Sequence, residues 1–303
     1  MKVLITGGTG FVGKVVVQEL LAQKFEVVVL TRNITHAALT LGSKCSYFQW
    51  IDTSKELPPI EAFYGVDAVI NLMGEGIADK RWTDEQKKKL QTSRIDSTAR
   101  LVEAMGQLPK KPSVLVSTSA VGIYGDKGDV ELNEKSAVAD DFLARLCKDW
   151  EAQALKAQNF GTRVVIVRTG VVLGKNGGAL KKMLPIFKLG LGGPVGSGKQ
   201  YMSWIHVEDL AHMYVEAVTN NSMKGIFNGT SAHPATNAEF SKMLGKVLSR
   251  PAFAPAPGIA IKMVFGEMSQ VLLEGQKVLP VNFIENKFRF RMPTLEMALK
   301  ESV

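Results

Sequence analysis

Three glycines near the start of the chain have the spacing of a phosphate-binding loop. Gly7, Gly10 and Gly13 follow an apolar run at residues 3–5 and precede apolar residues at helical spacing. In such a loop Gly7 takes the tight turn, Gly10 lets the backbone approach a pyrophosphate, and Gly13 lets the helix pack close to the strand. The helix N-terminus then faces the anion. This pattern predicts a dinucleotide site, and a glycine-rich turn without a ligand is the alternative.

The residues after the second apolar run, 27–30, indicate which dinucleotide binds. NAD-binding chains usually carry an acidic residue there for the ribose hydroxyls, whereas this chain has Thr31, Arg32 and Asn33. Arg32 can contact a 2′-phosphate, and such a charge-assisted contact contributes about 1.5 to 3 kcal/mol. We therefore predict NADP(H) as the cofactor. The alternative for Arg32 is a solvated side chain at the start of a loop.

The predicted cofactor site extends from the glycine loop to the ends of neighbouring strands. It comprises Gly7, Thr9, Gly10, Phe11, Val12, Gly13, Thr31, Arg32, Asn71, Leu72, Met73, Gly74, Arg94 and Ser117. Glu75, Arg81 and Trp82 follow the strand that ends near Asn71, at the sheet edge where ligands bind. They either line the pocket or form a salt bridge within the loop.

A parallel sheet is needed to bring these residues together. Apolar runs of strand length occur at residues 3–5, 27–30, 68–72, 113–117 and 163–168, separated by stretches of helical periodicity. This alternation predicts an α/β fold with a Rossmann-type doubly wound parallel sheet. A capping box at residues 83–86 predicts the start of a helix. The sequence KFRFR at 287–291 predicts a strand before a terminal helix.

The pattern changes near residue 175 and indicates a second, smaller unit. A glycine-rich loop region follows at 188–200, and an extended linker at 250–258. We predict a Rossmann domain over residues 1–174 and a C-terminal α/β cap domain over residues 175–303 that carries substrate specificity. Some strands and helices of the second unit are expected to return to the first.

The composition is typical of a globular protein without a membrane span or a metal site. The 303 residues are 46% hydrophobic, enough for a large core. We expect no membrane span, because no apolar run approaches the required ~20 residues, and no metal site, because the four histidines are scattered. Two cysteines without a CxxC motif suit a reducing compartment. The expected location is the cytoplasm, or an organelle interior if an upstream targeting segment was removed.

The net charge of +8 does not by itself indicate a nucleic-acid partner. The basic residues form short clusters without interleaved aromatic residues, as on solvated helix faces. We therefore expect a small-molecule substrate and no nucleic acid, and a homodimer remains open.

Several longer stretches resemble a known superfamily. TGGTGFVG (6–13), VSTSAVGIYG (116–125), VRTGVVLG (167–174) and WIHVEDL (204–210) stand in the order of an extended short-chain dehydrogenase/reductase. NLMGE, KRW, MLPIFKLGLGGPVGSGKQ and LLEGQKVLP narrow the resemblance to the atypical epimerase-family proteins, some of which carry cell-division labels. The resemblance covers nearly the whole chain. It implies an NAD(P)-dependent nucleoside-diphosphate-sugar epimerase-like protein.

The resemblance also implies a catalytic set from which this chain departs. Active members use a Ser after the middle strand, a Tyr-x-x-x-Lys pair on the next helix and an Asn on the preceding helix. The Tyr is the acid or base, and the Lys lowers its pKa. Ser119 matches the Ser. Counted from Glu151, Leu143 and Cys147 replace Tyr and Lys, and Arg94 stands near the Asn position.

Two interpretations of this altered site remain. Leu143 and Cys147 belong to a helical stripe with Leu146 and Trp150, which is typical of an apolar face packed on the sheet. A reactive Cys147 thiol is the alternative. Tyr124, five residues after Ser119, is either a substitute acid or a turn aromatic that packs over the cap domain.

The candidate catalytic residues are therefore Ser119 and Tyr124. His206 is expected to be structural. The first functional hypothesis is an NADP(H)-dependent oxidoreductase or epimerase-like enzyme that acts on a nucleotide sugar or another carbonyl compound. The second is a non-catalytic NADP(H)-binding regulatory protein, which the resemblance links to cell division.

Overall fold

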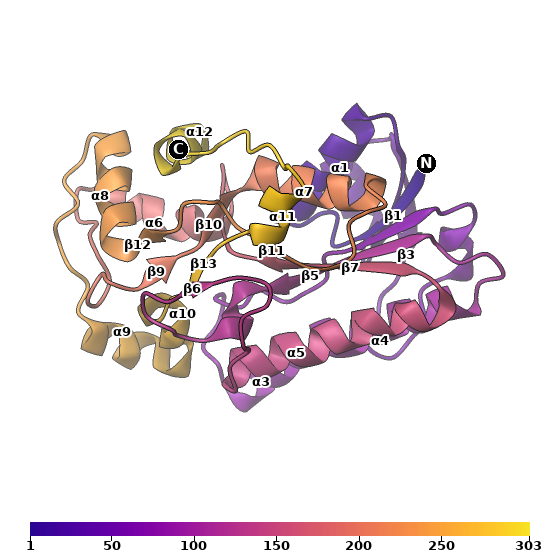
Figure 1. Cartoon of the computed structure of the whole chain (residues 1–303), viewed down its shortest axis with the longest axis horizontal. Coiled ribbons are helices and arrows are strands. Elements are labelled where there is room, and N and C mark those ends of the chain that lie inside the picture. The colour runs from indigo at the N-terminus through magenta and orange to yellow at the C-terminus, as the bar shows by residue number, and fades with distance from the viewer.

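A seven-stranded parallel sheet forms the centre of the computed structural model, which describes residues 1–303 (Figure 1). The strand order is β11-β7-β5-β4-β1-β2-β3. The strands are β1 (Lys2–Thr6), β2 (Glu26–Thr31), β3 (Cys45–Gln49), β4 (Ala68–Asn71), β5 (Val114–Ala120), β7 (Arg163–Thr169) and β11 (Gly225–Gly229). The order runs outward from β1 in both directions, so the predicted doubly wound α/β fold is confirmed.

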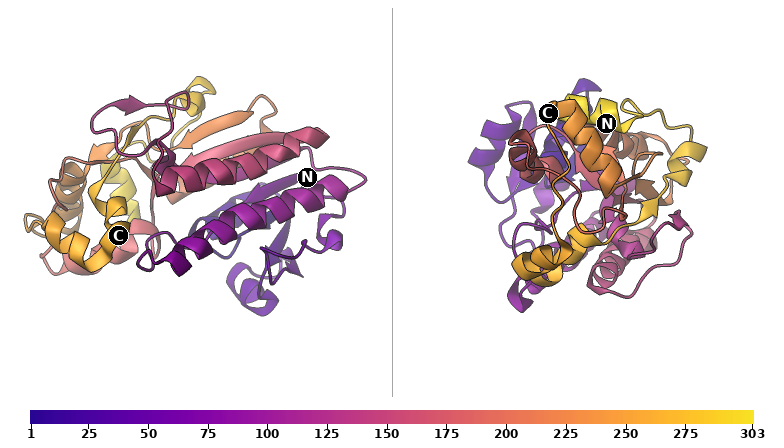
Figure 2. Two further views of the ribbon diagram at one scale, coloured as in Figure 1. Left: turned by 90° about the horizontal axis from the view of Figure 1, so that it is seen from below. Right: turned by 90° about the vertical axis from the view of Figure 1, so that its left-hand side faces the viewer.

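Helices cover both faces of the sheet because its strands are apolar on both sides. Val3 and Ile5 pack into one buried cluster, and Leu4 between them packs into the other. The first cluster lies under α1 (Phe11–Ala22) and α7 (Val207–Thr219), and the second under α4 (Ser97–Gln107) and α5 (Phe142–Leu155). Figure 2 shows α4 and α5 side by side across the sheet.

Smaller elements form the cap at one end of the sheet (Figure 1). Its helices are α6 (Gly178–Lys188), α8 (Asn237–Leu248), α9 (Gly258–Phe265), α10 (Gln270–Leu273) and α12 (Leu295–Ser302). Three two-stranded sheets accompany them: β8 (Val171–Leu173) with β10 (Trp204–His206), β9 (Tyr201–Met202) with β12 (Ala235–Thr236), and β6 (Glu131–Leu132) with β13 (Lys277–Val278). A separate apolar cluster that includes Trp204 and Phe240 holds the cap together.

The chain crosses between the large sheet and the cap more than once. After β7 it enters the cap, returns to the sheet through α7 and β11, and then enters the cap again through α8. Both parts therefore contain residues from beyond position 174. The division at residues 174/175 into a cofactor domain and a cap domain stays a prediction. None of the helices is both long enough and apolar enough to cross a bilayer.

The remaining helical segments connect these layers. They are α2 (Ile34–Leu41), α3 (Asp84–Gln91), α11 (Val281–Glu285), a π-helical turn at Thr92–Asp96, and 3₁₀ turns at Ile60–Phe63, Val121–Tyr124, Lys156–Phe160 and Gly266–Ser269. Thr83 caps α3 by accepting from the Gln86 amide, but the Gln86 side chain makes no hydrogen bond. The reciprocal half of the predicted capping box is therefore absent.

The strand predicted at residues 287–291 is wrong. This segment has no strand partner, although its residues alternate as in a strand. Phe288 packs edge-on against Phe283 and Phe290. The backbone N–H groups of Arg291 and Met292 donate to the Asp209 carboxylate instead of to a neighbouring strand. The terminal helix after Pro293 is present as α12.

Candidate functional site

The glycine loop joins β1 to α1 at the carboxyl edge of the sheet. Gly7 has a φ of +68°, a left-handed conformation that favours glycine, and its carbonyl accepts from the Gly10 N–H at 3.0 Å. A Cβ at Gly13 would lie 2.2 Å from the Gly7 oxygen. Gly10 caps α1 without a side-chain hydrogen bond, so the first-turn N–H groups are open to an anion.

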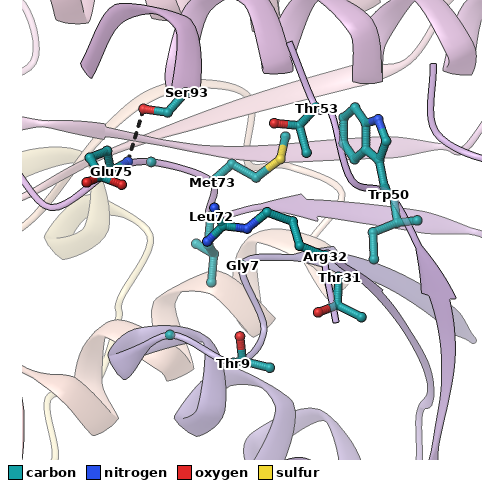
Figure 3. Close-up of a pocket in the computed structure, with 13 residues that line it drawn as sticks. Gly7, Thr9, Thr31, Arg32, Trp50, Thr53, Leu72, Met73, Glu75 and Ser93 are labelled. Atoms are coloured by element: carbon teal, nitrogen blue, oxygen red, sulfur yellow. Dashed lines mark hydrogen bonds between the residues drawn. The ribbon is translucent and has the colours of Figure 1, made fainter. Parts of the chain in front are cut away.

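A cavity of about 250 Å³ opens beside this loop (Figure 3). We call it the first cavity. Eight of the predicted cofactor residues line it: Gly7, Thr9, Gly10, Thr31, Arg32, Leu72, Met73 and Gly74. The structure therefore brings the glycine loop and the ends of β2 and β4 to one place.

The first cavity also has lining residues that the sequence did not assign to the cofactor. They are Leu30, Trp50, Thr53, Glu75 and Ser93. Trp50 and Thr53 follow β3, a strand that sequence reasoning missed, although Cys45–Gln49 includes two aromatic residues, Tyr47 and Phe48, of the kind that strands favour. Glu75 was expected near a pocket, and its N–H donates to the Ser93 hydroxyl at 3.0 Å (Figure 3).

Arg32 gives the first cavity its positive charge. The side chain is exposed, extends over the cavity (Figure 3), and has no acidic partner within 4.0 Å. No acidic residue stands at the end of β2 to accept from ribose hydroxyls. The charge at this edge therefore suits a phosphate better than a pair of ribose hydroxyls.

Several predicted cofactor residues lie behind the first cavity instead of in its wall. Asn71 is fully buried, accepts from the Thr6 hydroxyl at 2.8 Å, and donates to Thr98 and Ser117. These bonds fix the ends of β1, β4 and β5 relative to α4. Asn71 and Ser117 therefore hold the strand ends that form the first cavity and do not line the cavity themselves.

Phe11 and Val12 also point away from the first cavity. Phe11 lines a separate cavity of about 460 Å³ between α1 and the start of α7, and packs against Gly177. Val12 packs against the core cluster under α1. Either residue can offer a ligand its backbone N–H only.

A second cavity of about 550 Å³ lies between the sheet edge and the cap. Leu72, Met73 and Gly74 line both this cavity and the first, so the two adjoin. Ser119 and Cys147 also line the second cavity. A ligand that spans both cavities would reach the place where the resemblance puts the chemistry.

Ser119 belongs to a buried chain of polar contacts that runs behind the second cavity. Its hydroxyl donates to Glu151 Oε1 at 2.6 Å. Arg168 clamps both oxygens of that carboxylate at 2.9 Å and donates to the Tyr124 hydroxyl at 2.9 Å. Tyr124 in turn donates to Asn228 at 2.8 Å.

This network determines where the two candidate catalytic residues lie. Tyr124 is fully buried and does not line the second cavity, whereas Ser119 does. Burial raises the pKa of the Tyr124 phenol, and the Arg168 charge opposes that shift. The structure therefore brings Ser119 to the cavity wall and places the Tyr124 hydroxyl one layer behind it.

The α5 positions that replace Tyr and Lys form a packed face. Cys147 is 4% exposed and packs with Val121, Ile123 and Leu132. Burial raises the pKa of its thiol to about 11, and the Glu151 charge adds to this. Leu143 is half-buried at the cavity wall. Neither residue offers a proton donor or acceptor suited to neutral pH.

Other residues that the sequence singled out have structural contacts. Trp82 is buried against Phe142 and donates to the Ile77 carbonyl. Arg81 lies against Gly266. His206 is 2% exposed and caps α7, where its Nδ1 accepts from the Glu208 N–H at 3.4 Å. Burial lowers the pKa of His206, which keeps the ring neutral.

Two sequence families match this chain. The NAD-dependent epimerase/dehydratase family matches residues 3–228, which include all residues that line the first cavity and most of the large sheet. A domain of unknown function (DUF1731) matches residues 256–302, which include α9, α10 and α12 of the cap.

Curated relatives match over the full length of the chain. An Arabidopsis thaliana protein, "Epimerase family protein SDR39U1 homolog, chloroplastic", is 44% identical over 99% of this chain and 86% of its own. A Bacillus subtilis relative, "Epimerase family protein YfhF", is 36% identical over 100% of this chain and 98% of its own. The crystal structure of human epimerase family protein SDR39U1 with NADPH has a TM-score of 0.88 and 38% identity, and covers 99% of this chain and 98% of that one.

Proposed function

The chain belongs to the NAD-dependent epimerase/dehydratase family, and we propose that it binds NADP(H) across the two adjoining cavities. Arg32 carries this proposal, because it stands where NAD-binding chains usually have an acid and no carboxylate neutralises it. The NADPH in the human relative's crystal structure supports the same assignment. The pyrophosphate of the cofactor would lie on the first turn of α1, and the 2′-phosphate of its adenosine ribose would lie beside Arg32.

The chemistry proposed for this site is hydride transfer, which a bound nicotinamide supplies. The enzyme would act as an oxidoreductase or an epimerase-like enzyme on a small-molecule substrate, either a nucleotide sugar or another carbonyl compound. Ser119 places a hydroxyl at the cavity wall, and its bond to the Glu151 carboxylate, which Arg168 clamps, fixes its rotamer. Leu143 and Leu146 would exclude water from the reacting carbon.

A second candidate is a non-catalytic NADP(H)-binding regulatory protein. The buried Cys147 and the packed Tyr124 favour it, because losing a positioned general acid typically lowers a rate by about 10² to 10⁴. A link to cell division rests on the resemblance alone. We propose a location in the cytoplasm or an organelle interior, and the name of the Arabidopsis thaliana relative describes that protein as chloroplastic.

Calorimetry with NADPH and NADH, followed by a substrate screen, separates these candidates. We expect NADPH to bind at least about tenfold more tightly than NADH, the lower end for one charge-assisted contact. The screen would follow NADPH oxidation with carbonyl compounds and interconversion of nucleotide sugars. Turnover that Ser119→Ala reduces supports the enzyme, and NADPH binding without turnover supports the regulator. Equal affinity for the two cofactors would contradict the assignment of Arg32.

A further inference from the structure

Arg94 lies where the helical run from α3 to α4 departs from α geometry. Thr92–Asp96 forms a π-helical turn, and such turns occur frequently at functional sites. The turn places Arg94 in the wall of the second cavity, together with Ser119 and Cys147. A positive charge therefore borders this cavity, although the α5 position where the resemblance implies a lysine is a cysteine.

The contacts of Arg94 hold its guanidinium in place without neutralising it. Nη2 donates to the Glu75 carbonyl at 2.7 Å, and Nη1 donates to the Leu90 carbonyl at 3.2 Å. The group lies 5.2 Å from the centroid of the Trp150 ring, which orients its plane. A Cβ at Gly74 would lie 3.1 Å from the guanidinium carbon, so this glycine leaves room for it.

No carboxylate oxygen lies within 4.0 Å of Arg94. Lys182, the other cation in this cavity wall, is different, because its ammonium lies 2.9 Å from Asp79. A guanidinium has five N–H donors, and carbonyl oxygens take two of those on Arg94. Burial lowers the pKa of Arg94, and the charge of Glu75 opposes this only in part, so an anion in direct contact would offset more of the desolvation.

We propose that Arg94 binds the carboxylate of the substrate, and that the second cavity takes a monocarboxylic acid. This rests on the proposed function, because the acid would share the second cavity with the nicotinamide end of a cofactor that spans both cavities. A planar guanidinium matches a carboxylate through two parallel hydrogen bonds. Arg94 would thus orient the substrate toward the hydride. It would also stabilise negative charge that develops on a carbonyl oxygen next to the substrate's carboxylate.

The other walls of the second cavity restrict the rest of this substrate. Ile77, Leu143 and Leu146 are apolar and suit a hydrocarbon body. Asp141 and Glu274 also line the cavity, and burial raises the pKa of Glu274, with Asp141 adding to the shift. These two acids would repel any anion, and the one unpaired guanidinium, that of Arg94, can offset this repulsion for a single carboxylate but not for two phosphate charges. A monoanion with an apolar body therefore fits better than a nucleotide sugar, which carries two phosphate charges.

The test is calorimetry with wild-type protein at saturating NADPH. The probes are 4-methyl-2-oxopentanoate, its uncharged methyl ester, and UDP-glucose. We expect the acid to bind, and the ester and UDP-glucose to bind at least about tenfold more weakly, as loss of a charge-assisted pair predicts. Equal binding of acid and ester, tighter binding of UDP-glucose, or no binding of the acid at 50 mM would each overturn the proposal.

Variants assign this binding to Arg94. Arg94→Met should weaken binding of the acid at least about tenfold. Arg94→Lys should lose less of this affinity. NADPH affinity should change less than about threefold in both, below the cost of a lost contact. Arg100→Met, which removes an α4 arginine paired with Glu103, is the matched control and should leave acid binding unchanged. An equal loss of NADPH affinity in Arg94→Met would assign Arg94 to the cofactor and overturn the proposal.

The same titrations without cofactor separate this proposal from the proposed function. If wild-type protein binds no NADPH but binds the acid through Arg94, the cofactor assignment fails and the carboxylate site stands. If NADPH binds and the acid does not, the carboxylate site fails and the cofactor assignment stands. Arg94→Lys keeps the test valid if Arg94→Met does not fold, because it retains the buried charge.

Discussion

The glycine loop and the cavity face of α5 lie at the same sheet edge but depend on different parts of the chain. At the loop the backbone itself forms the site, and a Cβ at Gly13 would overlap the Gly7 carbonyl at 2.2 Å. On α5 the chemistry would come from side chains, and Leu143 and Cys147 pack there without disturbing the helix. A site made by backbone tolerates little substitution, whereas a side-chain site can lose its reactive groups while the fold is kept.

The largest expected effect is at the loop. Gly10→Val should abolish NADPH binding, because a branched side chain would fill the path of the pyrophosphate. The fold should survive, since a Cβ at Gly10 meets only the Gly7 oxygen, at 3.2 Å. Calorimetry and circular dichroism measure the two properties. Gly258→Val is the control, because its Cβ would meet ordinary contacts from 3.5 Å outward. A folded Gly10→Val protein that still binds NADPH would show that the glycine loop does not hold the pyrophosphate.

Arg32→Asp tests whether a side chain adds selectivity to the backbone site. NADPH affinity should fall about 10- to 100-fold, the value of one charge-assisted contact, and NADH should become the preferred cofactor. Arg32→Lys should retain most of the preference for NADPH. A loss of less than about threefold in Arg32→Asp would mean that Arg32 does not contact the phosphate.

Tyr124→Phe tests the layer behind the second cavity. Removing the hydroxyl leaves Arg168 and Asn228 each short of a partner, so the free energy of unfolding should fall by about 1 to 3 kcal/mol. Denaturant titration measures this. Tyr64→Phe is the matched control on a 62% exposed tyrosine, where we expect a change within about 0.5 kcal/mol. Unchanged stability with lost turnover would instead support a catalytic Tyr124.

Cys147→Ala should have the smallest effect, about 1 kcal/mol of stability at pH 7, with NADPH affinity unchanged. The wild-type thiol should resist alkylation in the folded protein, because burial raises its pKa from 9.0 to about 11. An unfolded chain releases this proton first, so the contribution of Cys147 to stability is present below pH 9 and declines toward pH 11. Urea titrations from pH 8 to 11 should show a steeper decline for wild type than for Cys147→Ala. If the thiol reacts in the protein without cofactor and bound NADPH prevents that reaction, the packed-face interpretation is contradicted.

Backbone-determined features were the ones that sequence could predict. The glycine spacing and the apolar strands identify the loop and five of the seven sheet strands, because a buried parallel strand requires apolar residues on both faces. β3 was missed because its exposed edge leaves it only partly apolar. The segment at 287–291 was mistaken for a strand because alternation cannot reveal that the Asp209 carboxylate takes its N–H groups.

Side-chain environments were beyond what the sequence could predict. Tyr124 follows Ser119 closely in sequence, yet a 3₁₀ turn carries its hydroxyl behind the cavity to Asn228, 104 residues away in the chain. Arg94 was assigned to the cofactor, but the π-helical turn that brings it to the second cavity has no sequence signal that we can identify. Such placements depend on contacts between distant segments.

The return of the chain to the sheet through β11 also determines when the protein can complete its fold during synthesis. β11 pairs with β7 along Gly225–Gly229, and about 55 residues separate the two strands. At ribosomal rates of about 5 to 20 residues per second, the β7 edge stays without its partner for about 3 to 11 s. An unpaired apolar edge invites association with other chains. This protein should therefore depend on chaperones most strongly while β7 waits for β11.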